Sequence, residues 1–469
     1  MGTNTKKEFK MPHVYIILLI VMFIVVVLSW IIPSGEYGKM IDPITGKAIM
    51  DTNNFQYITN GTPIKILDFF KAIHNGIVQS GDIVISVIIA GGVLYIFETT
   101  GALGAGIHKV LSCSKGKELL VVVILHLLFV ILGAIGLNEG TIPFFPLVVS
   151  VVMALGYDRI VGVAVSQLGI AVGFTSGVLN LYTTGISQTI LGLPIFSGIE
   201  FRLGALILFA LSSTLYIGFY CRKIKNSPEK SIVAAEYLKQ INEKTENSEE
   251  KLELNFQRKL ALLMLLCLFI ATAYGSLNWK WGLAEFSAAY IILAIALTIL
   301  FKLKPSKVCE MISVGAARIL PAALVIGIAR ATMILMTQAK IMDTCIYKLA
   351  NILNNKSALS VLLIIYIAVI AFNFFVISAS GKAMIMMPIL GPLGQILKIN
   401  QQVMVLVYQY GDGITNYLWP SSGSLLVALS MCGVEWKDWV KFAWKFLLFW
   451  TILAFTVVLF ANYINLGPF

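Results

Sequence analysis

Four charged residues stand inside stretches of sequence that are otherwise strongly apolar. Glu139 and Asp412 are acidic, and Lys382 and Arg330 are basic. A charge in apolar surroundings is costly unless it meets a partner, so such residues are candidate functional groups by default. They could hold the opposite charges of a small ionic ligand. The structural alternative is that Glu139 and Asp412 sit in buried ion pairs and that Arg330 pairs with Glu98.

Three of these charges lie where polar residues and glycines interrupt the apolar sequence. Glu139 lies in 136–141 (Gly-Leu-Asn-Glu-Gly-Thr), and Lys382 lies in 378–382 (Ser-Ala-Ser-Gly-Lys). Asp412 lies in a longer interruption, 410–423, which has a counterpart at 173–185. Gly and Pro weaken a helix there, and unwound backbone offers carbonyls to cations and helix N-termini to carboxylates. Close Gly-xxx-Gly helix packing would also explain the glycines.

We predict that the four interruptions form the walls of one substrate-binding site. Its candidate residues are Asn138, Glu139, Gly140, Thr141, Thr175, Ser176, Asn180, Ser378, Ser380, Gly381, Lys382, Asp412, Thr415, Asn416, Ser421 and Ser422, with Arg330 as a candidate charge partner. The cysteines form no CxxC pair and the histidines no HExxH motif. We therefore expect no metal, no cofactor and no disulfide framework.

The composition places these residues in a membrane protein. Of the 469 residues, 58% are hydrophobic and only 13% are charged, whereas a soluble domain carries about a quarter charged residues. The uncharged runs are long enough for helices that span the hydrocarbon layer, and they lack the alternation of β-barrel strands. The net charge of +11 comes from Lys and Arg in connecting segments. That pattern indicates membrane topology and not a nucleic-acid partner.

The apolar runs define the candidate membrane segments. They are 12–32, 82–98, 119–157, 161–191, 202–221, 259–277, 283–301, 318–337, 358–397, 402–431 and 441–465. Segments 119–157 and 358–397 are too long for one span, and each is divided by a polar interruption. We predict that both are re-entrant hairpins, which enter and leave the membrane on the same side.

The basic residues favour this topology. With about nine spans, two hairpins and a cytoplasmic N-terminus, the basic linker 223–258 lies inside, whereas it would lie outside if 119–157 crossed only once. The linker separates an N-terminal half, 1–222, from a C-terminal half, 259–469. We expect it to be a solvated cytoplasmic connector.

The two halves contain an internal repeat. At one constant offset, Pro146 matches Pro388 and Gln167 matches Gln409. Each half has a hairpin followed by a broken helix, at 161–191 and at 402–431, and the predicted topology makes the halves run in opposite senses. The fold class is therefore an all-α polytopic membrane protein with an inverted repeat. Inverted repeats with broken helices are typical of secondary transporters.

Three short motifs are distinctive: 31–37 (Ile-Ile-Pro-Ser-Gly-Glu-Tyr), 138–141 (Asn-Glu-Gly-Thr), and 410–413 (Tyr-Gly-Asp-Gly) with Asn416. They resemble the anaerobic C4-dicarboxylate carrier family of the ion-transporter superfamily, and more closely its YfcC-like branch. The resemblance implies an elevator mechanism, in which a transport domain carrying both hairpins moves against a scaffold domain. It also implies a homodimer in the inner membrane. The branch implies basic amino-acid antiport, such as arginine–ornithine exchange, and the wider family name implies dicarboxylates.

The sequence thus favours a carrier for a small-molecule substrate, surrounded by membrane lipid. In the basic amino-acid hypothesis, Glu139 and Asp412 bind the cationic groups, and Lys382 with the serines of its interruption binds the α-carboxylate. In the dicarboxylate alternative, Lys382 and Arg330 face two carboxylates. A membrane enzyme would need a clustered acid–base or metal constellation, which the sequence does not offer.

Overall fold

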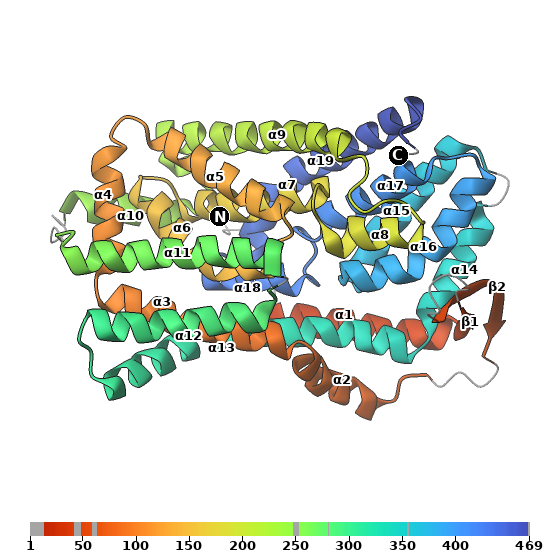
Figure 1. The fold of residues 1–469 in the computed structure, drawn as a ribbon, viewed down its shortest axis with the longest axis horizontal. Coiled ribbons are helices and arrows are strands. Elements are labelled where there is room, and N and C mark those ends of the chain that lie inside the picture. Colours follow the sequence, from red (N-terminus) through yellow and green to blue (C-terminus); the bar gives the residue numbers. More distant parts are fainter. Residues whose placement is uncertain are drawn as a thin grey trace, which may run out of the picture.

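The computed structural model describes residues 14–41, 48–58, 63–246, 253–279, 281–353 and 356–467, which are almost entirely helical. Most helices run along the long axis of the molecule in two layers (Figure 1). The first layer is centred on the long helix α13 (Pro305–Gln338), which packs against α1 (Val14–Ile31), α2 (Ile66–Gln79) and α3 (Gly81–Thr99), and α12 (Leu283–Leu300) packs against α3. Helices α11 (Phe256–Trp279) and α4 (Ala102–Cys113) adjoin this layer.

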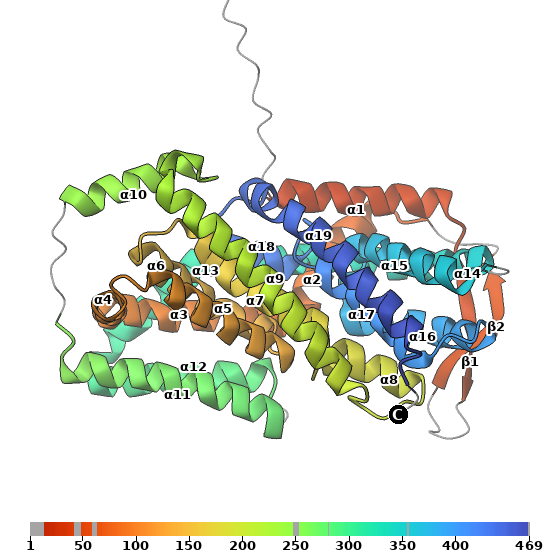
Figure 2. The ribbon, with the colours of Figure 1, turned by 90° about the horizontal axis from the view of Figure 1, so that it is seen from above.

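The second layer contains both predicted hairpins and both predicted broken helices. Its members are α5 (Glu118–Ala134), η1 (Glu139–Phe144), α6 (Phe145–Ala154), α7 (Arg159–Ser176), η2 (Leu181–Gly185), α8 (Ile186–Ile190), α9 (Ile199–Asn226), α15 (Ala358–Phe375), α16 (Ala379–Ile396), α17 (Gln401–Thr415), α18 (Gly423–Met431) and α19 (Trp436–Tyr463). Helix α9 lies across α7 (Figure 2). Helices α7 and α17 are buried along their whole length, so they form the centre of this layer.

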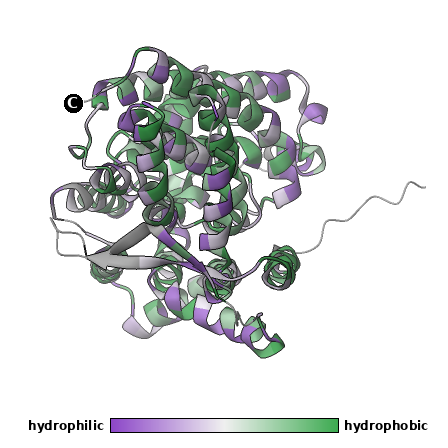
Figure 3. Cartoon of the chain, turned by 90° about the vertical axis from the view of Figure 1, so that its right-hand side faces the viewer, coloured by the Kyte–Doolittle hydropathy of each residue, from purple (hydrophilic) through white to green (hydrophobic). Residues whose placement is uncertain are grey.

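Small elements close the two ends of the molecule. The antiparallel strands β1 (Gly35–Ile41) and β2 (Ala48–Tyr57) lie with α14 (Ile341–Leu353) at one end, and η3 (Pro228–Lys230) and α10 (Ala234–Glu246) lie at the other (Figures 1 and 2). The strands and α2 are elements that the sequence analysis did not predict. Figure 3 looks from the end that carries the strands and shows hydrophobic residues on most helices.

The helices have the character of a multi-pass membrane protein. Among the described residues, seven stretches are long and apolar enough to cross a membrane: α3, the α7–α8 stretch, α9, α12, α13, α15 and α19. Large apolar side chains point outward on them, such as Ile207, which is 60% exposed, and Ile452, which is 62% exposed. Lipid is the solvent that accepts such a surface. Three predicted spans have other forms: α1 is shorter, α11 is not among the seven, and 402–431 is divided into α17 and α18.

The first predicted hairpin is a helix, a turn and a second helix. Its chain turns at Gly136, whose φ of 85° is in the left-handed region that favours glycine. Pro143 then lies inside η1, and Pro146 lies in the first turn of α6, where a missing N–H costs little. Lys117 and Tyr157, at its two outer ends, line one small cavity. The chain therefore returns to the end at which it entered.

The long segment after each hairpin is a helix that breaks near its middle. α7 ends at Gly177, with φ of 67°, and the side chain of Asn180 then accepts hydrogen bonds from the first amides of η2. α17 ends before Pro420, and the hydroxyl of Ser422 caps α18. These side chains satisfy backbone groups that the breaks would leave unpaired in an apolar interior.

The part of the linker that the structure describes is docked on the turn between α6 and α7. Asp158, which is 1% exposed, accepts hydrogen bonds from Val161 N (2.9 Å), Tyr220 Oη (2.8 Å) and Ser231 Oγ (2.6 Å). Burial raises the pKa of this carboxyl, and the hydrogen bonds lower it. Tyr237 of α10 donates to Gly156 O. The described part of the linker is therefore packed against this turn, where Ser231 and Tyr237 supply hydrogen bonds.

We expect Asp158→Ala to lower the free energy of unfolding by about 2–4 kcal/mol, since it removes a helix cap and two further hydrogen bonds at a buried site. Chemical or thermal unfolding in detergent measures the loss, and trypsin should cut the 223–258 linker faster in this variant. The matched control is Glu310→Ala, which breaks an exposed ion pair with Lys307 and should change stability by less than about 0.5 kcal/mol. Equal effects of the two substitutions would contradict the docking role of Asp158.

Candidate functional site

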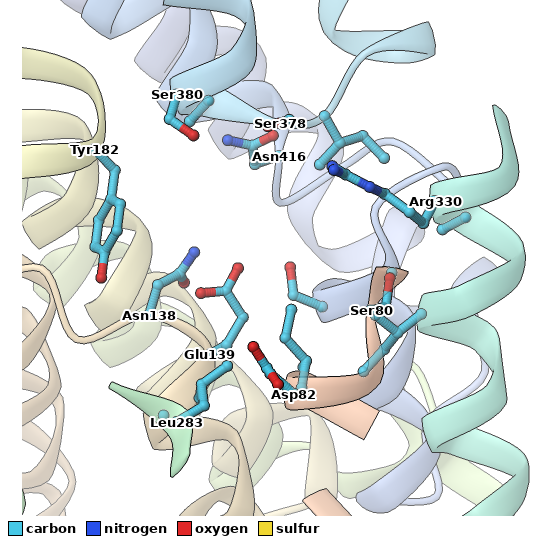
Figure 4. A pocket seen from close by; sticks show the side chains of 18 of the residues that line it. Ser80, Asp82, Asn138, Glu139, Tyr182, Leu283, Arg330, Ser378, Ser380 and Asn416 are labelled. Carbon is cyan, nitrogen blue, oxygen red and sulfur yellow. The ribbon is translucent and has the colours of Figure 1, made fainter. Parts of the chain in front are cut away.

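A cavity of about 500 Å³ lies between the two layers. It is lined by the turns of both hairpins, the residues after both helix breaks, and the facing parts of α3, α12 and α13. Figure 4 shows it from close by. Because each layer supplies part of the wall, a movement of one layer along the other would change the shape and access of this cavity.

Two carboxylates and one guanidinium face this cavity. Glu139 at the first hairpin turn and Asp82 at the start of α3 lie on one side, and Arg330 of α13 points in from the other (Figure 4). Among the described residues, none of the three forms an ion pair. Arg330 Nη1 lies 3.2 Å from Met333 Sδ. Three charges that lack an ion-pair partner among the described residues are therefore available to a ligand.

Arg330 does not pair with Glu98, which was the structural alternative for this residue. Glu98 forms an exposed ion pair with Arg318, at 3.2 Å, and neither residue lines the cavity. Asp82 was not among the predicted site residues. Asp82 is the first residue of the predicted segment 82–98, so its charge lies at the edge of the apolar run and not within it. Its place directly after Ser80-Gly81, where two helices meet, is the signal that could have identified it.

Lys382 and Asp412 pair with each other inside the second layer. Lys382 Nζ lies 2.6 Å from Asp412 Oδ1, and the two side chains are 1% and 0% exposed. Lys382 Nζ also donates to Asn373 Oδ1 at 2.5 Å. The amide of Asn373 in turn donates to the Asp412 carbonyl at 2.9 Å. The pair fastens the start of α16 to the end of α17, and neither side chain lines the cavity.

The other predicted residues divide into two groups. Asn138, Gly140, Ser378, Ser380 and Asn416 line the cavity beside Glu139 and Arg330. The rest lie behind the wall, and several of them have backbone partners. These residues are Thr141, Thr175, Ser176, Asn180, Gly381, Thr415, Ser421 and Ser422, of which Thr141, Ser176, Asn180 and Ser422 satisfy nearby backbone groups. Their spacing indicated a helix break correctly, but the side chains stabilise the break instead of facing the cavity.

The two broken helices are joined by hydrogen bonds. Gln409 Nε2 of α17 donates to Phe174 O near the end of α7, at 2.7 Å, and Thr184 Oγ1 of η2 donates to Gln409 Oε1, at 3.2 Å. These bonds therefore tie the break after α7 to the side of α17. Tyr182 and Tyr417, one after each break, also line the cavity.

Comparison with known proteins identifies the family. The profile of the C4-dicarboxylate anaerobic carrier family matches residues 11–463. The chain belongs to this family. Two relatives match this chain over nearly its whole length. An Escherichia coli protein with the provisional name basic amino acid antiporter YfcC is 26% identical over 474 residues, covering 93% of each chain. An uncharacterized protein of Haemophilus influenzae is 27% identical over 483 residues, covering 94% of this chain and 95% of its own.

Two solved structures align with this carrier at low similarity. The YdaH transporter of Alcanivorax borkumensis covers 97% of this chain and 100% of its own, with 16% identity and a TM-score of 0.43. Neisseria gonorrhoeae MtrF, described with a class of antimetabolite efflux pumps, covers 96% and 95%, with 15% identity and a TM-score of 0.42.

The Lys382–Asp412 pair makes a testable stability prediction for this carrier. Lys382→Met or Asp412→Leu alone should lower the free energy of unfolding by about 3–5 kcal/mol, because each leaves an uncompensated buried charge. The double variant should regain at least half of that loss, because no buried charge remains. Thermal unfolding of purified protein in one detergent gives all four values. Additive losses in the double variant would show that the two side chains do not act as a pair.

Proposed function

We propose that this carrier exchanges basic amino acids across the membrane. The observation that carries the proposal is the charge pattern of the cavity, where two carboxylates and one guanidinium have no ion-pair partner among the described residues. A basic amino acid has two cationic groups and one carboxylate, which is the complementary set. The provisional name of the Escherichia coli relative, a basic amino acid antiporter, supports the same substrate class.

In this proposal, Glu139 and Asp82 bind the two cationic groups, and Arg330 binds the α-carboxylate. A guanidinium and a carboxylate form strong, oriented hydrogen bonds. The hydroxyls of Ser378 and Ser380 and the amide of Asn416 line the same cavity and supply further polar contacts. The roles expected for Asp412 and Lys382 pass to Asp82 and Arg330, because Asp412 and Lys382 already neutralise each other.

The same charges favour exchange over net uptake. With Glu139 and Asp82 ionised, the empty cavity has one negative charge in excess of Arg330. Moving that charge through a low-dielectric layer is unfavourable. A basic amino acid has one net positive charge and neutralises it, so the loaded carrier crosses more readily than the empty one. The charges of Lys382 and Asp412 cancel each other throughout, so this pair requires no coupling cation.

The arrangement of the helices in two layers suggests how the carrier moves its substrate. We propose an elevator in which the second layer, with both hairpins, shifts along the first, with the cavity at their boundary.

A dicarboxylate substrate is the alternative that the family name favours. It would bring two further negative charges to Glu139 and Asp82, with Arg330 as the cation of the cavity wall.

Counterflow in proteoliposomes tests the substrate and its site. Radiolabelled arginine should enter vesicles preloaded with ornithine, and replacing sodium by choline should leave the rate unchanged. Glu139→Gln should reduce arginine exchange at least tenfold, as expected for the loss of about 1.5 kcal/mol of charge-assisted bonding.

The matched control is Glu98→Gln, which removes an exposed carboxylate outside the cavity and should leave exchange within about twofold, as for other exposed ion pairs. Unchanged exchange in Glu139→Gln, at equal protein level, would remove Glu139 from the site. Uptake of succinate in place of arginine would favour the dicarboxylate alternative.

We also propose an inner-membrane protein with a cytoplasmic N-terminus. Single cysteines at the exposed positions Lys115 and Lys230, in a background without the native cysteines, should react with an impermeant maleimide only from the cytoplasm. A cysteine at the exposed position Asn54, at the opposite end of the molecule (Figure 1), should react only from outside. If positions 230 and 54 react from the same side, both the topology and the inverted repeat are wrong.

A further inference from the structure

A second polar cluster lies inside the second layer, away from the substrate cavity. It is built around Arg202 in the first turns of α9, which is only 1% exposed. Gln188 of α8, Gln402 of α17 and Ser197 in the α8–α9 connection surround it. None of these residues lines the cavity. The cluster therefore has no part in the proposed substrate site.

The hydrogen bonds of the cluster leave the guanidinium largely unsatisfied. Gln402 Oε1 accepts from Arg202 Nη2 at 3.5 Å and from Gln188 Nε2 at 3.3 Å. Gln188 Oε1 accepts from Phe196 N at 2.6 Å. Arg202 Nε and Nη1 are buried and have no partner, and Arg202 forms no ion pair within the part of the chain that the structure describes. The hydroxyl of Tyr410 is also buried without a partner, and its ring packs at 5.5 Å against Phe209, which lies two turns after Arg202 on α9.

The charge of Arg202 is the decisive feature. A guanidinium remains protonated in proteins, so it cannot escape burial by losing its proton. Amide oxygens and water molecules accept hydrogen bonds but do not neutralise a full positive charge. Buried charges are paired with an opposite charge in nearly all proteins. The unused donors at this position all require an acceptor, and an anion is the acceptor that also balances the charge.

We propose that Arg202 binds a small inorganic monoanion, with chloride as the physiological candidate, through Nε, Nη1 and the Tyr410 hydroxyl. The cluster is enclosed by directly hydrogen-bonded side chains, which favours a single-atom halide over a larger oxyanion. The bound anion would hold α8, α9 and α17 together. Its effect is on the stability of the layer that carries the substrate site, and it does not depend on which substrate is transported.

Halide dependence of the wild-type protein is the direct test. At constant ionic strength, changing sodium gluconate to sodium chloride should raise the thermal-unfolding midpoint by about 2 °C or more, as expected for a ligand that binds only the folded state. Bromide should act like chloride, and a crystal grown in bromide should show anomalous scattering beside the guanidinium of Arg202.

Two variants locate the effect. Arg202→Gln should abolish the difference between chloride and gluconate, and Tyr410→Phe, which removes one donor and keeps the ring, should reduce it. Arg318→Gln is the matched control, because it removes an exposed guanidinium and should leave the chloride response unchanged. A wild-type protein that responds equally to both salts, or bromide bound elsewhere and not at Arg202, would overturn the proposal and indicate water in the cluster.

Discussion

The need to satisfy backbone polar groups in an apolar interior governs this structure. Two helices at the centre of the second layer, α7–α8 and α17–α18, break where no water is available to their backbones. Asn180 and Ser422 cap the chain after each break, and Gln409 bonds the end of one broken helix to the other. With these partners, irregular backbone is stable at the centre of the layer. The cavity lies beside these breaks, and residues that follow both of them line part of its wall.

The charges of the interior follow the same rule in two ways. Lys382 and Asp412 neutralise each other and fasten α16 to α17. Among the residues that the structure describes, Glu139, Asp82 and Arg330 have no such partner, and they share one cavity. In our proposal, the closed pair contributes to the integrity of the layer, and the three cavity charges bind the substrate. The distinction assigns a structural role to two residues whose types alone suggested binding.

The contact between the layers places the site at a boundary. Helix α13 packs against α3 and α2 within the first layer and against α18 of the second. Arg330 lies on α13, and Glu139 lies on the first hairpin of the second layer. Substrate charges would therefore be shared between the two layers, and a bound substrate would affect how easily one moves along the other. The docked linker adds a restraint at the α6–α7 turn through Asp158.

The sequence by itself determined the fold class, the family and the places where helices break, because apolar length, glycine, proline and polar caps act locally. It also identified Glu139 and Arg330 as charges in apolar surroundings. It did not separate them from the Lys382–Asp412 pair, since pairing depends on how α16 meets α17. The sequence did not identify Asp82 and Arg202 for a related reason. Each is the first residue of a predicted apolar segment, where a charge marks the end of the apolar run. Only the packing of neighbouring helices decides whether that charge meets water, a cavity or a closed interior.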